Sequence, residues 1–198
     1  MSSLRIDDFK KSLQFGGARP SLFEIEWAGA DASTLTGGYL KADREALLVK
    51  ASSLPASTIT PIPVPFRGRQ LMVAGDRLFD PWSITIINDN DFGIRKGFEY
   101  WMHRIAHHVD GETSNKETLG PNGYMCDMLV HQLDRTGDRV YTYKFTGVWP
   151  SNISPIELNY DAESQIEQYD IQLQVTYWES VVNGTYIAGR NSDGDYQG

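Results

Sequence analysis

The feature that most constrains this chain is a run of strict alternation near its C-terminal end. Tyr169, Ile171, Leu173, Val175 and Tyr177 are separated by a polar residue at every intervening position. Successive side chains of a β-strand point to opposite faces, so this pattern predicts a strand with one buried face and one hydrated face. A helix would scatter the same residues around its axis. We therefore expect a sheet protein whose core lies on one side of this strand.

Similar patterns recur along the chain and predict further strands. Residues 23–27, 82–86 and 141–145 alternate in the same way, and residues 45–54 form another candidate strand. Residues 28–44 are rich in small and polar residues and indicate a loop or an exposed hairpin. The predicted fold class is mainly β with one packed α-helix, a β-sandwich or strongly bent barrel.

Helical spacing is clearest in one segment. Apolar residues recur every three or four positions from Ile94 to Val109, with Asp91 as the expected N-cap and Asp110-Gly111 as the expected end. A second, short helix is predicted over residues 3–15. We expect one domain over residues 1–179 and a C-terminal extension over 180–198, in which Asn183-Gly184 predicts a hairpin.

Three prolines mark one segment as the border of a sheet. Pro61, Pro63 and Pro65 lie two residues apart, so in an extended chain their missing N–H groups all fall on one edge. The other edge can still pair with a neighbouring strand. A turn is predicted farther on, at 74–76.

Composition restricts the classes of partner. The formal net charge is -8, and Cys126 is the only cysteine. An acidic chain does not bind DNA through neutralised phosphates, and one thiol forms no disulfide within the chain. Residues 1–15 lack the apolar run of a secretory signal, and no stretch approaches the ~20 apolar residues that cross a bilayer. We expect a soluble protein made in a cytoplasm, with no membrane insertion.

Two groups of side chains have the residue types of a metal or catalytic site. His103 and His107 share a helix face, and His108 and His131 could join them, but Arg104 stands where a zinc metalloprotease carries its general-base glutamate. We therefore expect structural histidines.

The second group is acidic. Asp76, Asp80, Asp89 and Asp91 could bind a cation or act in acid–base chemistry. Turn formation and helix capping explain these residues better. No nucleophile turn and no phosphate-binding loop is present, so we predict no catalytic, cofactor or metal site and no enzyme activity.

Five short segments occur in a fixed order along the chain: ARP at 18–20, IPV at 62–64, AGDRLFDPW at 74–82, GVWPSN at 147–152 and YWE at 177–179. Taken in order, they resemble segments of the tail tube proteins of T-even-type contractile bacteriophages, and AGDRLFDPW matches best. The resemblance covers residues 18–179. Residues 28–44 and 180–198 depart from the family pattern.

The resemblance implies a structural subunit that forms hexameric rings. The rings would stack into a tube that conducts DNA and the tape-measure protein, inside a contractile sheath. Implied partners are further copies of the chain and the sheath, baseplate, tape-measure and tail terminator proteins. DNA would pass without specific binding. The protein would assemble in the host cytoplasm and reside in the virion.

Candidate contact residues follow from the resemblance and from the chemistry of the 56–82 segment. For contacts between rings we expect Phe66, Arg67, Arg69, Asp76, Arg77, Phe79 and Trp82. Phe79 and Trp82 could equally be core residues. For the polar faces that line the lumen or meet a neighbour we expect Thr142, Lys144, Gln172 and Gln174. An acidic lumen would repel phosphate over the ~8 Å Debye length.

Three alternatives stay open at the sequence level. A tube-related protein at the end of the tube, such as a baseplate tube initiator, has a similar sequence. A monomeric carbohydrate-binding sandwich would use its aromatic residues to line a groove. A metal-dependent hydrolase would use His103, His107 and His131.

Overall fold

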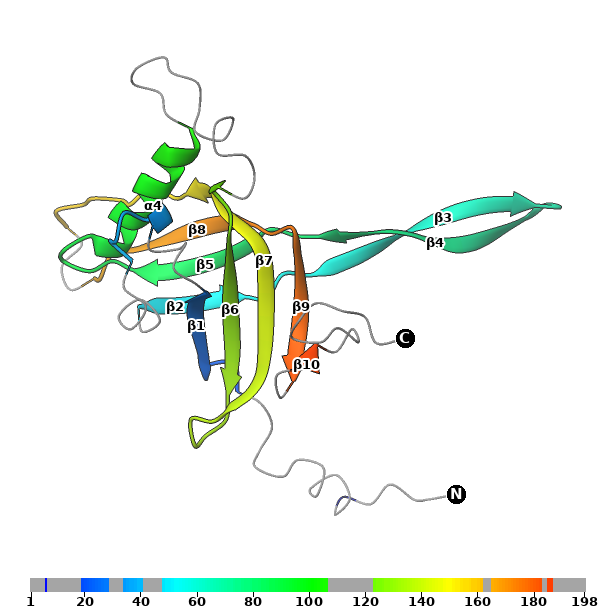
Figure 1. Cartoon of the computed structure of the whole chain (residues 1–198), viewed down its shortest axis with the longest axis horizontal. Coiled ribbons are helices and arrows are strands. Elements are labelled where there is room, and N and C mark those ends of the chain that lie inside the picture. Colours follow the sequence, from blue (N-terminus) through cyan, green and yellow to red (C-terminus); the bar gives the residue numbers. More distant parts are fainter. Residues whose placement is uncertain are drawn as a thin grey trace.

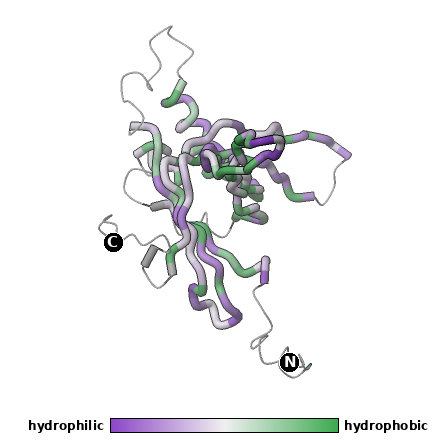
Figure 2. Tube along the Cα trace, turned by 90° about the vertical axis from the view of Figure 1, so that its right-hand side faces the viewer, coloured by the Kyte–Doolittle hydropathy of each residue, from purple (hydrophilic) through white to green (hydrophobic). Residues whose placement is uncertain are grey.

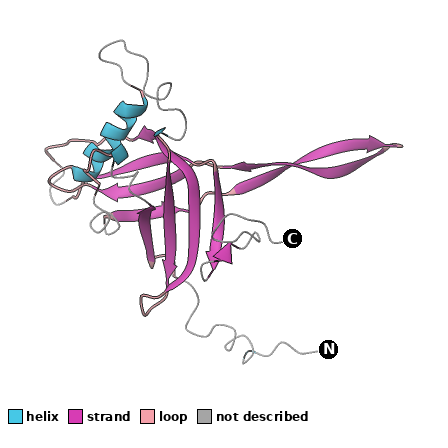
Figure 3. Cartoon of the chain, viewed as in Figure 1, coloured by secondary structure: helices cyan, strands magenta, loops and turns pink. Residues whose placement is uncertain are grey.

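The computed structural model describes residues 6, 19–28, 34–40, 48–106, 123–161, 165–182 and 185–186. A body of crossed strands carries one helix at one end and a long two-stranded arm at the other (Figure 1, Figure 3). The strands and helix in chain order are β1 Phe23–Ala28, β2 Val49–Ser53, β3 Ser57–Phe66, β4 Arg69–Phe79, β5 Trp82–Ile87, α4 Gly93–Ile105, β6 Cys126–Leu133, β7 Arg139–Ile153, β8 Gln168–Gln174, β9 Tyr177–Val182 and β10 Thr185–Tyr186. The expectation of a mostly β fold with one packed helix is confirmed.

The body is one eight-stranded sheet folded into two layers. Its order is β1-β6-β7-β8-β5-β2, with β9 paired to β7 and β10 paired to β9. The long strand β7 joins the layers, because Thr142–Thr146 pair with β9 whereas Trp149–Ile153 pair with β8. The layers cross in Figure 1, where β6, β7 and β9 run across the direction of β5 and β8. The sheet is not closed into a barrel within one copy, since β1, β2 and β10 each pair with a single neighbour among the described strands.

Gly147 makes the corner of β7. Its φ of 65° lies in the left-handed region, and a Cβ at this position would collide with Thr176 Oγ1. The Gly147 N–H donates to Asp127 Oδ1 at 3.3 Å, and Thr176 Oγ1 donates to the Gly147 carbonyl at 3.3 Å. Glycine is therefore required where the strand passes from one layer to the other.

The core lies between the two layers and beneath α4. Trp82 of β5 stacks on Phe145 of β7 with ring centroids 4.6 Å apart, which joins the layers. From the helix, Phe98 meets Trp27 of β1 edge to face at 5.4 Å, and Trp101 is also buried. Offset and edge-to-face aromatic pairs of this kind add to the free energy gained from burial alone.

The C-terminal alternation is confirmed for β8 and wrong beyond it. Tyr169, Ile171 and Leu173 are buried as expected, but the strand ends at Gln174 and a new strand begins at Tyr177. The chain turns here, because β8 pairs with β5 and β7 in one layer whereas β9 pairs with β7 in the other. The predicted single strand is therefore two strands.

The helix differs from the prediction at both ends. Phe92 has a left-handed φ of 53°, and the Gly93 N–H donates to Asp89 Oδ1 at 3.0 Å, so Asp89 rather than Asp91 satisfies the first free donor. The helix ends at Ile105, earlier than the periodicity predicted. A left-handed residue before the helix moves its start and so changes which carboxylate reaches it.

The remaining predictions have mixed outcomes. Leu35, Thr36 and Leu40 are buried, so part of the 28–44 segment contributes to the core, whereas a loop or exposed hairpin was expected. β9 pairs with β10 at Val181–Val182 and Thr185–Tyr186, on either side of the position where a hairpin was predicted. The predicted helix over 3–15 lies outside the described residues, apart from Ile6.

Candidate assembly surfaces

The arm is a hairpin of β3 and β4 that pairs with no other strand in the described residues. Its tip is a two-residue turn in which Arg67 and Gly68 have φ of 45° and 79°. Two successive positive φ values are those of a type I′ hairpin turn, whose twist matches that of the flanking strands. The predicted turn at 74–76 is wrong, because β4 runs without interruption from Arg69 to Phe79.

The prolines fix which edge of β3 can pair. Pro61, Pro63 and Pro65 lie opposite Ala74, Met72 and Gln70 of β4. Proline has no N–H to donate, so these residues occupy positions that would not hydrogen-bond to β4. The outer edge of β3 then lacks the same three donors and cannot add a full further strand. The arm is therefore suited to side-chain contacts along this edge.

Apolar side chains of the arm are exposed on both of its faces. Phe66, Leu71 and Met72 are 66%, 62% and 60% exposed. The other large exposed apolar residues of the arm are Ile59, Ile62, Val64, Val73 and Leu78. Figure 2, in which the arm points toward the viewer, shows hydrophobic and hydrophilic residues interspersed along the trace. An isolated two-stranded hairpin is only marginally stable in water, and a contiguous apolar surface of this kind marks an interaction site.

The base of the arm is fixed to the body by aromatic and charged contacts. Arg77 Cζ lies 4.9 Å from the centroid of the Phe79 ring and 5.3 Å from that of Trp178, within cation–π distance. Arg77 Nη2 also donates to Ser57 Oγ at 2.9 Å. Phe79 meets Trp178 edge to face at 6.1 Å. Arg77 and Phe79 therefore hold the arm at its base.

Trp82 is corrected as a candidate contact residue. It is 0% exposed, stacks within the core and donates from Nε1 to Ser52 Oγ at 2.9 Å. A side chain with no exposed surface has nothing to offer a neighbour, so Trp82 is a core residue. The other candidates lie along the arm, where Phe66, Arg67 and Arg69 are at the tip and Asp76 is on β4.

The four candidate polar-face residues divide between the two layers. Thr142 and Lys144 lie on the β9-paired half of β7, whereas Gln172 and Gln174 lie on β8. All four are partly exposed and none belongs to the core. Lys144 Nζ pairs with Asp127 Oδ2 at 3.0 Å, and Gln174 Nε2 donates to Ser151 Oγ at 3.3 Å. The candidates on one polar face are therefore close to paired charges, whereas Gln172 and Gln174 on the other are uncharged.

His131 anchors the charged face. It is 3% exposed; Nε2–H donates to Glu26 Oε2 at 3.0 Å, since a carboxylate can only accept, and Nδ1 forms a hydrogen bond of 2.8 Å with the Thr142 hydroxyl. Arg139 lies within 3.2 Å of Glu24 and 3.1 Å of Glu26. Both imidazole nitrogens of His131 are engaged, so it has none left for a metal.

The proposed histidine site is not assembled in the described residues. His103 lies on α4, and His107 falls outside those residues. Within the described ranges no three histidine, cysteine or acidic side chains lie close enough to hold a metal ion. None of the helices in the same ranges has the length and apolar character to cross a bilayer.

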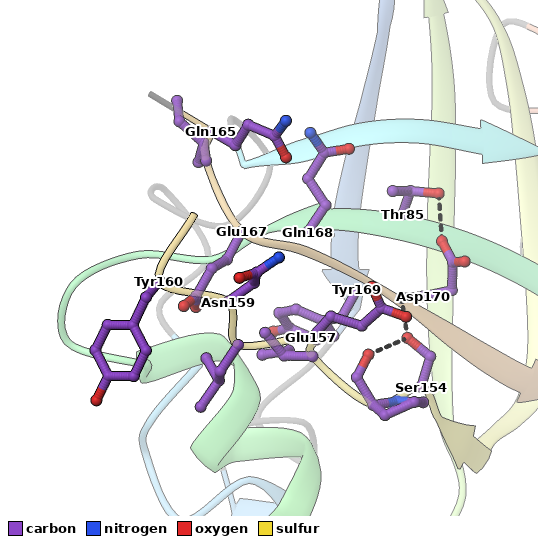
Figure 4. Close-up of a pocket in the computed structure, with 14 residues that line it drawn as sticks. Thr85, Ser154, Glu157, Asn159, Tyr160, Gln165, Glu167, Gln168, Tyr169 and Asp170 are labelled. Carbon is purple, nitrogen blue, oxygen red and sulfur yellow. Dashed lines mark hydrogen bonds between the residues drawn. The ribbon is translucent and has the colours of Figure 1, made fainter. Parts of the chain in front are cut away.

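A groove of about 790 Å³ opens between β8 and the segment that leads into it (Figure 4). Its wall is formed by residues 154–160 and 165–167, and Thr85, Gln168 and Asp170 contribute from β5 and β8. The Thr85 hydroxyl donates to Asp170 Oδ1 at 2.6 Å. Tyr169 also lines the groove, and burial raises the pKa of its hydroxyl. No sequence pattern predicts this groove, because an irregular segment has no periodic signal.

Comparison with known proteins agrees with this architecture. A family model described as "Phage tail tube protein" matches residues 18–181. Tail tube protein gp19 of Enterobacteria phage T4 is 31% identical over 176 residues, which cover 88% of this chain and 99% of that protein. The tail tube protein of Serratia phage KSP90 is 30% identical over 135 residues, covering 68% of this chain and 73% of that protein.

Two solved structures share the fold. A chain from the anti-feeding prophage baseplate superposes with a TM-score of 0.60 at 11% identity, covering 84% of this chain and 96% of that one. A chain from the sheath/tube terminator of PVC, an extracellular contractile injection system, gives a TM-score of 0.57 at 8% identity, covering 84% and 97%. The family match and the phage relatives together show that this chain belongs to the phage tail tube protein family.

Proposed function

We propose that copies of this tail tube protein close into hexameric rings, and that the β3–β4 arm joins each ring to the next. The stacked rings form the inner tube of a contractile tail. The observation that carries this proposal is the arm, which projects from the body with large apolar side chains exposed along its length. Such a surface is stable in water when another chain covers it.

Ring closure follows from the unclosed sheet. The end strands β1 and β2 each pair with one neighbour among the described strands, which leaves backbone N–H and C=O groups along their outer edges. Joining the sheets of successive copies satisfies those groups and removes the edges. A cyclic arrangement lets every copy use the same two surfaces.

The polar faces suit a channel that lets DNA pass without specific binding. On the charged face, Lys144 and Arg139 are paired with carboxylates, and on the other face Lys50 donates to Gln168 Oε1 at 2.7 Å. DNA binding requires lysines and arginines that neutralise phosphates, and the net charge of -8 opposes it. Thr142, Lys144, Gln172 or Gln174 line the lumen or meet a neighbouring copy in this proposal.

The role is structural and not catalytic. The proposed partners are other copies of the chain and the sheath, baseplate, tape-measure and tail terminator proteins. Two observations support this set: the phage relatives are named tail tube proteins, and the fold neighbours come from baseplate and sheath/tube terminator assemblies. The protein is assembled in the host cytoplasm and is then part of the virion tail.

Substitutions in the arm test the proposal. Val64 and Leu71 lie opposite each other in the arm, and both are exposed. The variant Val64→Asp/Leu71→Asp should lose rod formation while the thermal unfolding midpoint of the unassembled protein stays within a few degrees of wild type. Electron microscopy and circular dichroism provide the two measurements. Normal rods from this variant would refute the role of the arm.

A further inference from the structure

The groove lined by residues 154–160 and 165–170, referred to as the 154–170 groove, is acidic and partly apolar. Glu157, Glu167 and Asp170 line it, and none of these carboxylates pairs with a lysine or arginine in the part of the chain that the structure describes. The nearby Arg95 is paired with Glu99 at 2.8 Å. No lysine or arginine occurs in the sequence from 145 to 189. Two cations border the groove without pairing with these carboxylates, because Arg95 Nη1 donates to the Ser154 carbonyl at 3.3 Å and Lys50 Nζ donates to Gln168 Oε1 at 2.7 Å. The lining therefore has an excess of carboxylates over cations.

Apolar side chains stand at the rim of the same groove. Leu158 is 83% exposed, and Tyr160 and Ile166 are also exposed. Tyr169, buried at the groove, has a hydroxyl without a hydrogen-bond partner among the described residues. A ligand that brings apolar groups and hydrogen-bond donors together would match this lining.

The tip of the arm has the complementary chemistry. Residues 60–75 include Arg67 and Arg69 and no aspartate or glutamate. Arg67 Cζ lies 5.5 Å from the centroid of the Phe66 ring, so the cation and the aromatic ring are presented together. Arg69 lies directly opposite Phe66 in the hairpin. Guanidinium groups form directional hydrogen bonds with carboxylates, and an aromatic ring supplies an apolar anchor.

Resting on the proposed stacking of rings, we infer that the arm tip of one copy docks in the 154–170 groove of a copy in the adjacent ring. The tip of the arm and the segments beside the start of β8 that line the groove lie toward opposite ends of the molecule, so they cannot meet within one chain (Figure 1). A contact between two different surfaces of identical copies is heterologous and propagates instead of closing as a pair. One such contact per copy would extend the tube by one ring at a time.

Cysteine cross-linking tests this contact in assembled protein. In the variant Arg67→Cys/Glu157→Cys, mild oxidation of rods should give a ladder of covalent dimers, trimers and longer species on a denaturing gel. Each single variant should give dimers at most, because the native Cys126 is buried and one accessible cysteine cannot link a chain to two neighbours. The matched control Arg67→Cys/Asp138→Cys places the second thiol on the β6–β7 turn and should give no ladder.

Charge reversal provides a second test of the contact. Glu157→Lys/Glu167→Lys should lose rod formation, as should Arg67→Glu/Arg69→Glu, and the combination of all four substitutions should restore it. Normal rod formation by Glu157→Lys/Glu167→Lys would overturn the docking site, and so would rods of Arg67→Cys/Glu157→Cys that give no ladder. Neither result would contradict the proposed tube. Wild-type chain that never forms rings or rods would instead refute the proposed function. If the groove is covered only after a sheath protein is added, the groove is a binding site for the sheath, and the inference is overturned.

Discussion

The corner glycine of β7 provides a quantitative test of the fold. In the variant Gly147→Ala, alanine must adopt a φ of 65°, which costs about 1–2 kcal/mol. Its Cβ also collides with Thr176 Oγ1, and crowding of this kind costs about 1–3 kcal/mol. Alanine recovers about 0.4–1 kcal/mol because the unfolded chain has less conformational freedom. The free energy of unfolding should therefore fall by about 2–4 kcal/mol.

Thermal unfolding of the unassembled protein measures this loss. For a chain of this size each kcal/mol lowers the midpoint by about 2–4 °C, so the Gly147→Ala midpoint should fall by about 10 °C. Gly38→Ala is the matched control, because Gly38 has a φ of 74° and nothing within 4 Å of its added Cβ. In a Thr176→Ala background, the penalty for Gly147→Ala should shrink toward that of the control but stay above it, because the Cβ of residue 176 and Met125 Sδ still lie 3.1 and 3.4 Å from the added Cβ. Equal midpoints for the two single variants would refute the argument that the corner is crowded.

Three further predictions concern single side chains. Trp82→Ala removes a fully buried indole and should lower the free energy of unfolding by about 3–5 kcal/mol, measured by chemical denaturation. Asp89→Ala removes the acceptor for the Gly93 N–H and should lower the free energy of unfolding by about 1 kcal/mol in the same assay. An unchanged free energy of unfolding would contradict the capping role. The Thr136 hydroxyl, followed by backbone N–H groups, holds the pKa of Asp134 below its ordinary value of 3.8. The stability contributed by Asp134 should be fully present above pH 3.8 and should be lost as the pH falls through the lower pKa of the folded state. In Thr136→Val, NMR titration should find the pKa of Asp134 closer to 3.8.

Alternation predicted the strands of this protein well where one face of a strand is buried in the same chain. β1, β5 and β8 all have apolar residues at every second position, and those residues form the core. The break between β8 and β9 was not predictable, because Val175 and Tyr177 continue the alternating pattern across it. The break comes from the two-layer arrangement, in which the chain leaves one layer and joins the other after a bend at Thr176.

The arm shows where local patterns fail for a different reason. The prolines correctly predicted a sheet border, but Ala74-Gly75-Asp76 has the residue types of a turn and lies inside β4. Gly75 is needed there because an added Cβ would lie 2.5 Å from the Thr60 carbonyl oxygen, at the irregularity between Ile59 and Pro61. A glycine required by close approach of a paired strand has the same sequence signature as a glycine in a turn.

The segment and the chemical type of the candidate site residues were predictable from the sequence, but which of them face a partner was not. The 56–82 segment was identified from its prolines, its charges and its resemblance to the family, and most of it forms the arm. Trp82 was misplaced because an aromatic residue at the end of a segment can face the core or a partner, and its partner Phe145 is distant in sequence. The 154–170 groove depends on how an irregular segment folds back on β8, which no short pattern encodes.

The central claim is that identical copies join at their sheet edges and that the arm connects successive rings. Cryo-electron microscopy of rods grown from the purified full-length chain tests this claim most directly. We predict hollow rods of stacked six-membered rings, with sheets continuous between neighbouring copies and the β3–β4 arm in contact with the next ring. Density in which the arms are free in solvent, or a concentrated protein that remains monomeric, would contradict it.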